Sequence, residues 1–375
     1  MTTNSNQICT RCVMDNVADN SIRFADDGTC NYCNDALSRR ESEYFPNEQG
    51  ERMLNQLMDQ IKADGKTRDF DCLIGVSGGV DSSYLLYMGY QFGLRILAVH
   101  IDDGFDTYTA KQNIDKLCKK AKVELISVQP DLEQYKDLTR SFYLARVPYI
   151  TVPQDNLLFK ALNDTLKKYK ISYSIDGGNF STESILEKGL LVNCLDKKHI
   201  YAIHKQFGKG PIDKLNLMSF YERYIYDRYF RKAKKVRPLN YIDYNQNKVL
   251  EALAEFCGYE YYGAKHYESI LTRFMQCYYL PERYNMDIRK SHLSSLVISG
   301  QISREEALEK LAQSPYTSQQ LMEEDFSFMM NFLEMTKEEF EAVLAQPPLL
   351  HTDYKMSAIQ NFAGVARKFR RYLGE

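Results

Sequence analysis

The stretch "LIGVSGGVDSSYLL", residues 73–86, decides the fold of this chain. An apolar run ends at Val76, two glycines, an aspartate and three serines follow, and apolar residues then return. Glycines let a backbone approach a ligand closely, and the free N–H groups of a helix N-terminus bind phosphate. Three interpretations are open: Ser77 is a nucleophile, the loop binds a phosphate, or it is only a tight turn between a strand and a helix.

The segments around this loop alternate between short apolar runs and helical patterns. Strands are expected at 71–76, 95–101, 123–128 and 171–176, and helices at 81–92, 108–121, 132–145 and 155–169. This alternation predicts an α/β fold with a doubly wound parallel sheet. After about residue 240 the strand pattern fades, and helices are expected at 245–257, 266–279, 289–299, 303–313 and 335–345. Ser303 and Glu306 form a capping-box pattern at the start of one of them.

Four cysteines near the N-terminus have the spacing of a metal site. Cys9-x2-Cys12 is followed by 17 residues and then by Cys30-x2-Cys33. Two such pairs can supply four thiolates to one tetrahedral ion, which predicts a structural zinc ribbon. Metal binding would supply folding energy to a segment too short to have a sufficient core. An iron–sulfur cluster and four unliganded thiols remain alternatives.

These patterns divide the chain into four expected parts. They are a zinc ribbon at 1–45, a linker helix at 46–69, the α/β domain at 70–240 and a mainly helical region at 241–375.

The composition limits which binding partners and which cellular compartment are expected. The formal net charge of −2 over 375 residues gives no overall basic field, so nucleic acid is not an expected partner. No apolar run approaches the length of a membrane-spanning helix, and the first residues lack the hydrophobic core of a signal peptide. A cytoplasmic location without membrane association is therefore expected.

The loop at residues 77–83 matches neither the Walker A pattern nor GxGxxG. "SGGVDSS" after an apolar strand instead resembles the PP-loop of the N-type ATP pyrophosphatases, a superfamily that cleaves ATP between its α- and β-phosphates. The resemblance implies a PP-loop ATP pyrophosphatase domain at 70–240. It also implies that the leaving pyrophosphate and its Mg²⁺ are held by Ser77, Gly78, Gly79, Asp81, Ser82 and Ser83.

Two later strand ends fit the same superfamily. In "AVHIDDG" the backbone at Val99 and His100 would meet adenine, with Asp102 close to the nucleotide. In "IDGGNFSTE" Gly177 and Gly178 allow close backbone approach. Parallel sheets bind ligands at the carboxyl ends of their strands, so the three stretches together predict ATP binding, although each alone could be an ordinary loop.

Further motifs extend the resemblance over most of the chain. They are "CTRCVMD", "IDGGNFSTES", "KHYESILTRFMQCYYLPERY" and "RKSHLSSLVISGQISREEAL". With the PP-loop, and from about Cys9 to Leu311, they resemble the N-acetyl sugar amidotransferase family (WbpG/PseA-like). This family acts in bacterial O-antigen and pseudaminic or legionaminic acid biosynthesis. The resemblance implies ATP-dependent conversion of an acetamido group to an acetamidino group on a nucleotide-linked sugar.

The ammonia for this reaction is expected from outside the chain. A glutaminase with an N-terminal nucleophile would need a cysteine after Met1, where Thr2 stands, and no class I glutaminase domain fits the remaining length. The resemblance implies a separate glutaminase and cyclase-like pair as the source.

The chemistry sets what the site must contain. Adenylation turns the amide oxygen into a leaving group, and ammonia then displaces AMP, so the site must stabilise phosphate charge and exclude water. The catalytic candidates are Asp81, Glu183, Lys265 and His266. The substrate-binding candidates are Glu268 and Arg273, although the segment 264–274 could also be a capped helix with surface charges.

A second basic segment, 221–238, has seven Lys or Arg residues against two acids, interleaved with tyrosine. It suits a solvated helix face, a small-molecule phosphate or RNA.

Two other functions remain open. The chain could be a PP-loop enzyme that modifies tRNA, a thiolase or a lysidine-type ligase, or a zinc-ribbon adaptor with a degenerate nucleotide domain. The net charge and the lack of a catalytic cysteine pair near the PP-loop argue against the first, and the intact SGGxDSS argues against the second.

Overall fold

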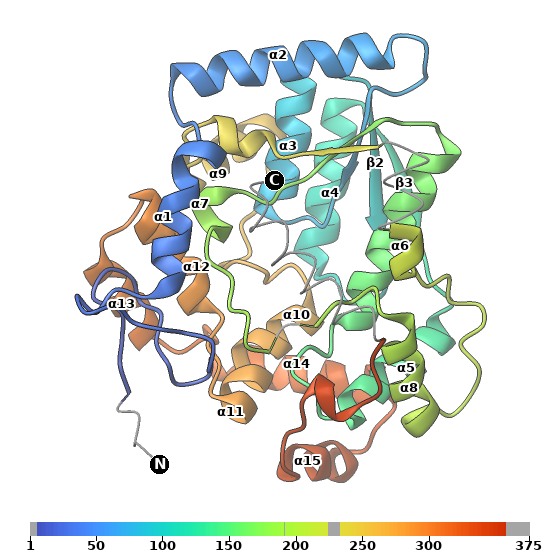
Figure 1. Ribbon diagram of the computed structural model, residues 1–375. Coiled ribbons are helices and arrows are strands. Elements are labelled where there is room, and N and C mark those ends of the chain that lie inside the picture. The colour runs from blue at the N-terminus through green and yellow to red at the C-terminus, as the bar shows by residue number, and fades with distance from the viewer. Residues whose placement is uncertain (1–5, 191, 224–232, 358–375) are drawn as a thin grey trace.

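The computed structural model describes residues 6–190, 192–223 and 233–357. A five-stranded, all-parallel sheet runs through it in the order β3-β2-β1-β4-β5 (Figure 1). The strands are β1 (Cys72–Gly75), β2 (Ile96–Ile101), β3 (Glu124–Val128), β4 (Tyr173–Ile175) and β5 (Lys234–Val236). The chain moves outward from β1 to β3 and then returns to the other side of β1. The point where the strand order reverses, between β1 and β4, is where such sheets form their ligand crevice.

Both faces of the sheet are covered, as a doubly wound fold requires. Cys72 and Ile74 of β1 pack against helices on one face, whereas Leu73 packs against the opposite face. The first face carries α2 (Glu48–Gly65), α3 (Val80–Gln91), α4 (Tyr108–Ala121) and α9 (Gln246–Cys257), and the second carries α6 (Val152–Lys168). A strand buried on both sides is apolar throughout, which is why the run before the PP-loop has no polar alternation. The predicted α/β fold with a doubly wound parallel sheet is confirmed.

The predicted mainly helical C-terminal third is also confirmed within the described residues. Its helices are α10 (Ile270–Phe274), α11 (Leu280–Tyr284), α12 (Arg289–Ser299), α13 (Arg304–Ala312), α14 (Gln319–Phe332) and α15 (Lys337–Ala345). One π-helical turn, Met275–Tyr279, joins α10 to α11. The capping box of Ser303 and Glu306 is present at the start of α13. The expected helix at 266–279 begins only at Ile270, because Ser269 has extended backbone and caps the helix by accepting the Thr272 N–H.

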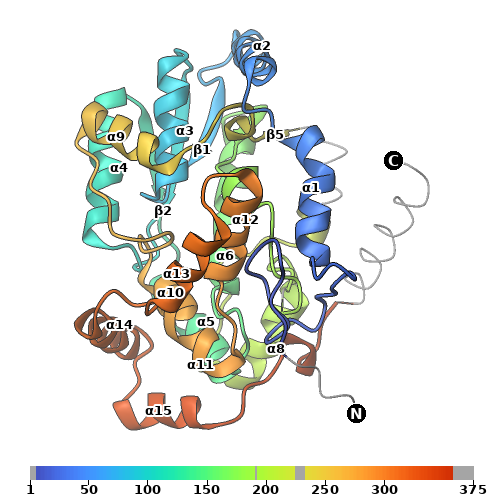
Figure 2. The same cartoon turned by 90° about the vertical axis from the view of Figure 1, so that its left-hand side faces the viewer.

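The C-terminal helices pack on helices from the first half of the chain. α5 (Leu132–Leu144), α8 (Lys197–Phe207), α10 and α14 share the largest hydrophobic core, which includes Phe142, Ile203, Phe274 and Met329. Figures 1 and 2 place these helices together, below the sheet. Neither α8 nor β5 follows from the sequence patterns above.

The N-terminal region packs on the same body. α1 (Asn31–Glu43) lies beside α12, and both adjoin α7 (Phe180–Glu183), which follows β4. Tyr44, which follows α1, stacks on Phe180 with ring centroids 5.4 Å apart. Of the helices in the described ranges, none combines the length and apolar character that crossing a membrane requires.

Candidate functional site

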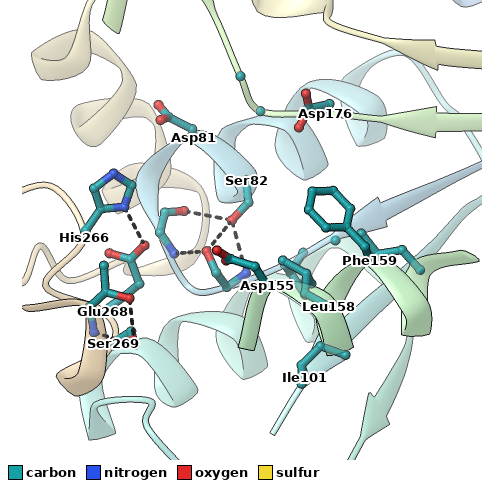
Figure 3. A pocket seen from close by; sticks show the side chains of 18 of the residues that line it. Asp81, Ser82, Ile101, Asp155, Leu158, Phe159, Asp176, His266, Glu268 and Ser269 are labelled. Carbon is teal, nitrogen blue, oxygen red and sulfur yellow. Dashed lines mark hydrogen bonds and ion pairs between the residues drawn. The ribbon is translucent and has the colours of Figure 1, made fainter. Parts of the chain in front are cut away.

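A cavity of about 660 Å³ opens at the carboxyl ends of β1, β2 and β4 (Figure 3). This volume lies in the range of pockets that bind small molecules. The residues from the sequence analysis that line it are Ser77, Gly79, Asp81, Ser82, His100, Gly177, Gly178, Glu183, Lys265, His266 and Glu268. Gly78, Ser83, Val99, Asp102 and Arg273 are not among the lining residues. Four parts of the chain that are distant in sequence therefore meet in one cavity.

The loop at residues 77–83, called the PP-loop here for its sequence resemblance, leaves β1 and enters α3 in a shape that depends on glycine. Gly78 has a φ of +76°, and a Cβ there would lie 2.6 Å from the carbonyl oxygen of Ala110. The Gly79 N–H donates to Ser77 Oγ (3.2 Å), and the Ser77 N–H donates to Ser82 Oγ (3.3 Å). The N-cap residue of α3 is Gly79, which has no side chain to bond the first N–H groups of the helix. The first turn of α3 is thus suited to an anion.

An ion cluster of Asp81, Glu183 and Lys265 lies beside this loop. Lys265 Nζ is 3.2 Å from Glu183 Oε1 and 3.7 Å from Asp81 Oδ2, and it donates to Thr182 Oγ1 (3.1 Å). Burial disfavours the ammonium form, but the two carboxylates outweigh this effect and raise the pKa of Lys265. Burial also raises the pKa of Asp81, against the opposing effect of Lys265. Lys265 is thus a cation at neutral pH in the part of the pocket where phosphate charge would lie.

His266 and Glu268 close the pocket on the other side of the loop. His266 has a φ of +67°, rare for a residue with a side chain, and its Nδ1 is 3.7 Å from Glu268 Oε1. A Cβ on Gly79 would lie 2.9 Å from that same Glu268 oxygen, so any larger residue there would displace the Glu268 carboxylate. The Thr107 N–H donates to the Glu268 carbonyl (2.9 Å), which joins this loop to the segment after β2. Glu268 Oε2 is buried without a hydrogen-bond partner in the described residues.

His100 enters the pocket through its side chain rather than only its backbone. Its Nδ1 is 2.9 Å from the Val76 carbonyl oxygen, and its Nε2 is 3.1 Å from Asp106 Oδ2. Both partners are acceptors, so the ring bonds both only as an imidazolium. Burial opposes this charge, but the Asp106 carboxylate outweighs it and raises the pKa of His100. The ring fixes the end of β1 from which the PP-loop departs.

Two other predicted nucleotide-binding residues, in and just after β2, form hydrogen bonds within the protein. The Val99 carbonyl accepts the Val76 N–H (2.8 Å). The carboxylate of Asp102 accepts bonds from Lys111 Nζ (2.8 Å) and Gln129 Nε2 (2.7 Å). A contact of Val99 or Asp102 with the nucleotide stays a prediction.

Several pocket residues were missed by the sequence analysis. The Tyr244 hydroxyl donates to Asp81 Oδ1, and the Tyr262 hydroxyl accepts the Val80 N–H (3.2 Å). His292 of α12 has its Nδ1 3.2 Å from the Thr182 carbonyl, and burial lowers its pKa to about 3, with a further effect from Lys265. Asp155 of α6 also lines the cavity. No local motif marks these positions, because each is brought to the site by the packing of a distant element.

Part of the basic segment 221–238 adjoins the pocket. Lys235 Nζ and Arg237 Nε are 3.0 and 2.9 Å from Asp176 Oδ2, at the end of β4. Residues 224–232 of this segment lie outside the described residues. The choice among a solvated face, a phosphate site and an RNA site therefore stays open.

Arg273 has a structural position rather than the substrate-binding position expected from the sequence. Its Nε and Nη2 form a two-pronged ion pair with Asp325 of α14, at 2.7 and 2.6 Å, and both side chains are buried. The Tyr316 hydroxyl also donates to this carboxylate (2.9 Å). The pair joins α10 to α14, so Arg273 stabilises the helical core instead of lining the cavity.

Replacing Arg273 by methionine should therefore lower stability more than substrate affinity. Removing one partner of a buried ion pair costs about 3–5 kcal/mol, because the remaining charge is left unpaired. Denaturant unfolding measures this loss, and the exposed Arg52→Met change in α2 is the control. A variant of unchanged stability with a sharply raised KM for substrate would instead place Arg273 in the substrate site.

The four cysteines converge on one point. Cys9 Sγ is 3.7 Å from Cys33 Sγ, Cys12 Sγ is 3.6 Å from Cys30 Sγ, and all four sulfurs lie within 4.8 Å of one another. Sulfurs bound to a single zinc at about 2.3 Å stand roughly 3.8 Å apart in a tetrahedron. An iron–sulfur cluster would distribute the thiolates over several irons and hold them farther apart. The arrangement thus fits one tetrahedral ion, as the zinc-ribbon prediction requires.

The cysteine centre is attached to the pocket through α12. Arg304 Nε donates to the carbonyl oxygens of Cys9 and Cys12, each at 3.1 Å. The Val13 N–H donates to Ser294 Oγ (3.2 Å) on α12. On its other side, α12 contacts the α7 segment, where Ser295 Oγ accepts the Ile185 N–H (3.0 Å). The four-cysteine cluster therefore supports the segment that carries Thr182 and Glu183.

Solved structures give only distant likenesses. A U34-tRNA thiolase, NcsA, from Methanococcus maripaludis with its [4Fe-4S] cluster is 13% identical, with a TM-score of 0.33 over 89% of this chain and 100% of that one. An NH3-dependent NAD synthetase from Campylobacter jejuni is 15% identical, with a TM-score of 0.29 over 42% of this chain and 72% of that one. An NMN synthetase from Francisella tularensis is 16% identical, with a TM-score of 0.29 over 59% and 98%. At these TM-scores the likenesses carry no argument about this chain.

The sequence comparisons are more specific. No curated protein matches the chain significantly. A protein-family model, described as "LPS biosynthesis protein WbpG-like, C-terminal domain", matches residues 268–367. The match begins at the pocket residue Glu268 and continues through α10 to α15, and it agrees with the resemblance stated from the sequence motifs. Residues 268–367 of this chain are therefore similar in sequence to the WbpG-like C-terminal domain.

Proposed function

We propose that this chain is an ATP-dependent, AMP-forming amidotransferase that converts the acetamido group of a nucleotide-linked sugar to an acetamidino group. The observation that carries the proposal is the single cavity in which the PP-loop, the Gly177–Glu183 segment and the Lys265–Glu268 segment meet. The WbpG-like domain, named for LPS biosynthesis, supports a role in making bacterial surface polysaccharide.

The residues of the pocket have distinct roles in this reaction. The N–H groups of the α3 first turn, with Ser77 and Ser82, bind the phosphates that leave as pyrophosphate. Lys265 supplies positive charge beside them. Asp81 and Glu183 are the carboxylates next to the loop, and oxygen ligands of this kind suit Mg²⁺, so these two would hold it. When bound, Mg²⁺ neutralises phosphate charge as the α–β bond breaks.

In the proposed reaction the following bonds form and break. The acetamido oxygen attacks the α-phosphorus, the bond from this phosphorus to the bridging oxygen breaks, and pyrophosphate leaves with the electron pair. Ammonia adds to the activated carbon, and the C–O bond to AMP breaks. The products are the amidine, AMP, pyrophosphate and the proton that the nitrogen loses. Water in the pocket would hydrolyse the adenylate, so enclosure by the Lys265–Glu268 segment protects the intermediate.

One assay tests the proposal. The protein is incubated with ATP, Mg²⁺, ammonium and UDP- or CMP-linked acetamido sugars, and pyrophosphate is measured together with the mass of the sugar. We expect pyrophosphate release that depends on sugar, with the mass change of replacing O by NH. Release that occurs with tRNA and with no sugar would refute the proposal in favour of a tRNA-modifying enzyme. Free ammonium replaces the expected partner pair, so the test does not depend on that pair.

A further inference from the structure

Amidine formation from ammonium needs a base, and none of the residue roles assigned under the proposed function supplies one. Ammonium carries no lone pair, so it must lose a proton before nitrogen can attack the activated carbon. Most ammonia is protonated near neutral pH, as is usual for ammonium groups. The group that takes this proton must lie in the pocket and must not already be committed to another cation or hydrogen-bond donor.

Most carboxylates of the cavity have a partner. Asp81 and Glu183 face Lys265, and Asp176 faces Lys235 and Arg237. Asp106 bonds His100, Asp103 accepts bonds from Tyr135 and Gln154, and Glu268 faces His266. Asp155 also lines the cavity, and its carboxylate forms no hydrogen bond or ion pair in the part of the chain that the structure describes. It is therefore the uncommitted carboxylate of the site.

Within the described residues, the groups around Asp155 leave its carboxylate without a hydrogen-bond or ion-pair partner. It lies in the first turns of α6, followed by the apolar side chains of Leu158 and Phe159, which line the same cavity (Figure 3). His266, from the loop above the PP-loop, is the ionisable group that acts electrostatically on Asp155 across the pocket. The other titratable groups near it are Tyr149 before α6, Tyr135 of α5 and Cys194. Burial raises the pKa of each of these three, so they are neutral at physiological pH.

We propose that Asp155 is the general base that takes a proton from ammonium, so that ammonia attacks the adenylated carbon. In this step an N–H bond breaks and its electron pair stays on nitrogen, while the proton moves to a carboxylate oxygen of Asp155. The new C–N bond then forms, AMP leaves, and Asp155 returns its proton to water. The inference rests on the proposed function, since it assigns the step that follows adenylation.

The acidity of Asp155 fits this task. Burial in the pocket raises its pKa to about 7, and the nearby His266 limits the rise. A base is most effective when its pKa lies near the working pH, because it is then ionised and still able to hold a proton. Below about pH 7 Asp155 is protonated and cannot accept, so amidine formation should rise with pH up to that region and then become level.

The test separates adenylation from amidine formation in the full-length protein. Sugar-dependent exchange between ATP and labelled pyrophosphate reports adenylation without ammonium. Asp155→Asn should leave this exchange unchanged and slow amidine formation from ammonium about 100-fold at pH 7. The rate of the variant should then depend on the concentration of free ammonia alone. It should keep rising about tenfold per pH unit in the pH range where the wild-type rate is level. Asp155→Glu should recover part of the rate.

Asp164→Asn is the matched control. It removes a carboxylate from the same helix, where Asp164 pairs with Lys160 outside this cavity, and it should change neither reaction. Equal loss of exchange and amidine formation in Asp155→Asn would overturn the inference, as would wild-type amidine formation with an unchanged pH profile. Failure of the proposed function is distinguishable, because the wild-type protein would then show no sugar-dependent exchange.

Discussion

Asp81→Ala should abolish pyrophosphate release by this protein, with a loss of at least about 100-fold. Asp81 lies at the start of α3, between the Tyr244 hydroxyl and Lys265, so its removal changes the charge beside the PP-loop. Without this carboxylate the pocket loses a ligand suited to Mg²⁺, and Lys265 keeps only Glu183 as its anionic partner. In the proposed reaction, both effects act on the charge of the leaving pyrophosphate.

Asp81→Asn distinguishes a functional loss from misfolding. Burial raises the pKa of Asp81, so the ionised form costs stability above the unfolded pKa, and a neutral amide of the same size removes this cost. We expect Asp81→Asn to be as inactive as alanine while its melting temperature at pH 8 is not lowered. Asp115→Ala, on the exposed side of α4, is the control that should keep full activity. Full turnover in Asp81→Asn would mean that the active site lies elsewhere.

Cys30→Ala should remove bound metal and lower the thermal stability of the whole chain. We expect about one zinc per chain in the wild-type protein and almost none in the variant, as measured by elemental analysis under reducing conditions. Structural zinc contributes on the order of 10 kcal/mol to the folding of small metal-dependent domains, so the melting temperature should fall substantially. Iron in place of zinc, or no metal at all, would contradict the zinc prediction.

The same variant also tests whether the metal centre supports the pocket. Arg304 bonds the carbonyl oxygens of Cys9 and Cys12, and α12 lies between this region and the α7 segment. Cys30→Ala or a strong chelator should therefore reduce sugar-dependent pyrophosphate release, although no cysteine of the centre lines the cavity. Cys257→Ser is the control, since this half-buried thiol of α9 lies away from the centre. Undiminished activity after complete loss of metal would show that the two sites are independent.

The features that could be predicted from sequence are those encoded locally. The strand before the PP-loop is apolar on both faces, and the loop has its glycines at fixed positions, so β1 and α3 follow from a few residues. The spacing of the cysteine pairs similarly predicts that their four sulfurs lie close together, as they do in the structure. β5 has only three residues and is rich in lysine, so its own sequence favours a strand only weakly. It forms a strand because it pairs with β4.

The rest of the candidate site depends on contacts between distant residues. Arg273 looks like a substrate ligand in sequence because its partner, Asp325, comes 52 residues later. Asp155 lies in an ordinary helical pattern, and only the packing of α6 under the sheet places it in the cavity. Tyr244 and Tyr262 are two of 28 tyrosines, and nothing near them in sequence indicates that they contact the PP-loop domain.

The Lys265–Glu268 segment that covers the PP-loop also determines when the pocket becomes complete during synthesis. The PP-loop is made early, but its Gly78 carbonyl is bonded by the Tyr259 hydroxyl (2.7 Å), and Glu268 and Ile270 join the chain after β2 through backbone hydrogen bonds. A ribosome-bound chain that ends before these residues contains the segments of the sheet and of the phosphate loop but lacks the residues that close the cavity. Nascent chains should therefore not retain ATP, and nucleotide protection against proteolysis should begin only once residues 259–270 have emerged.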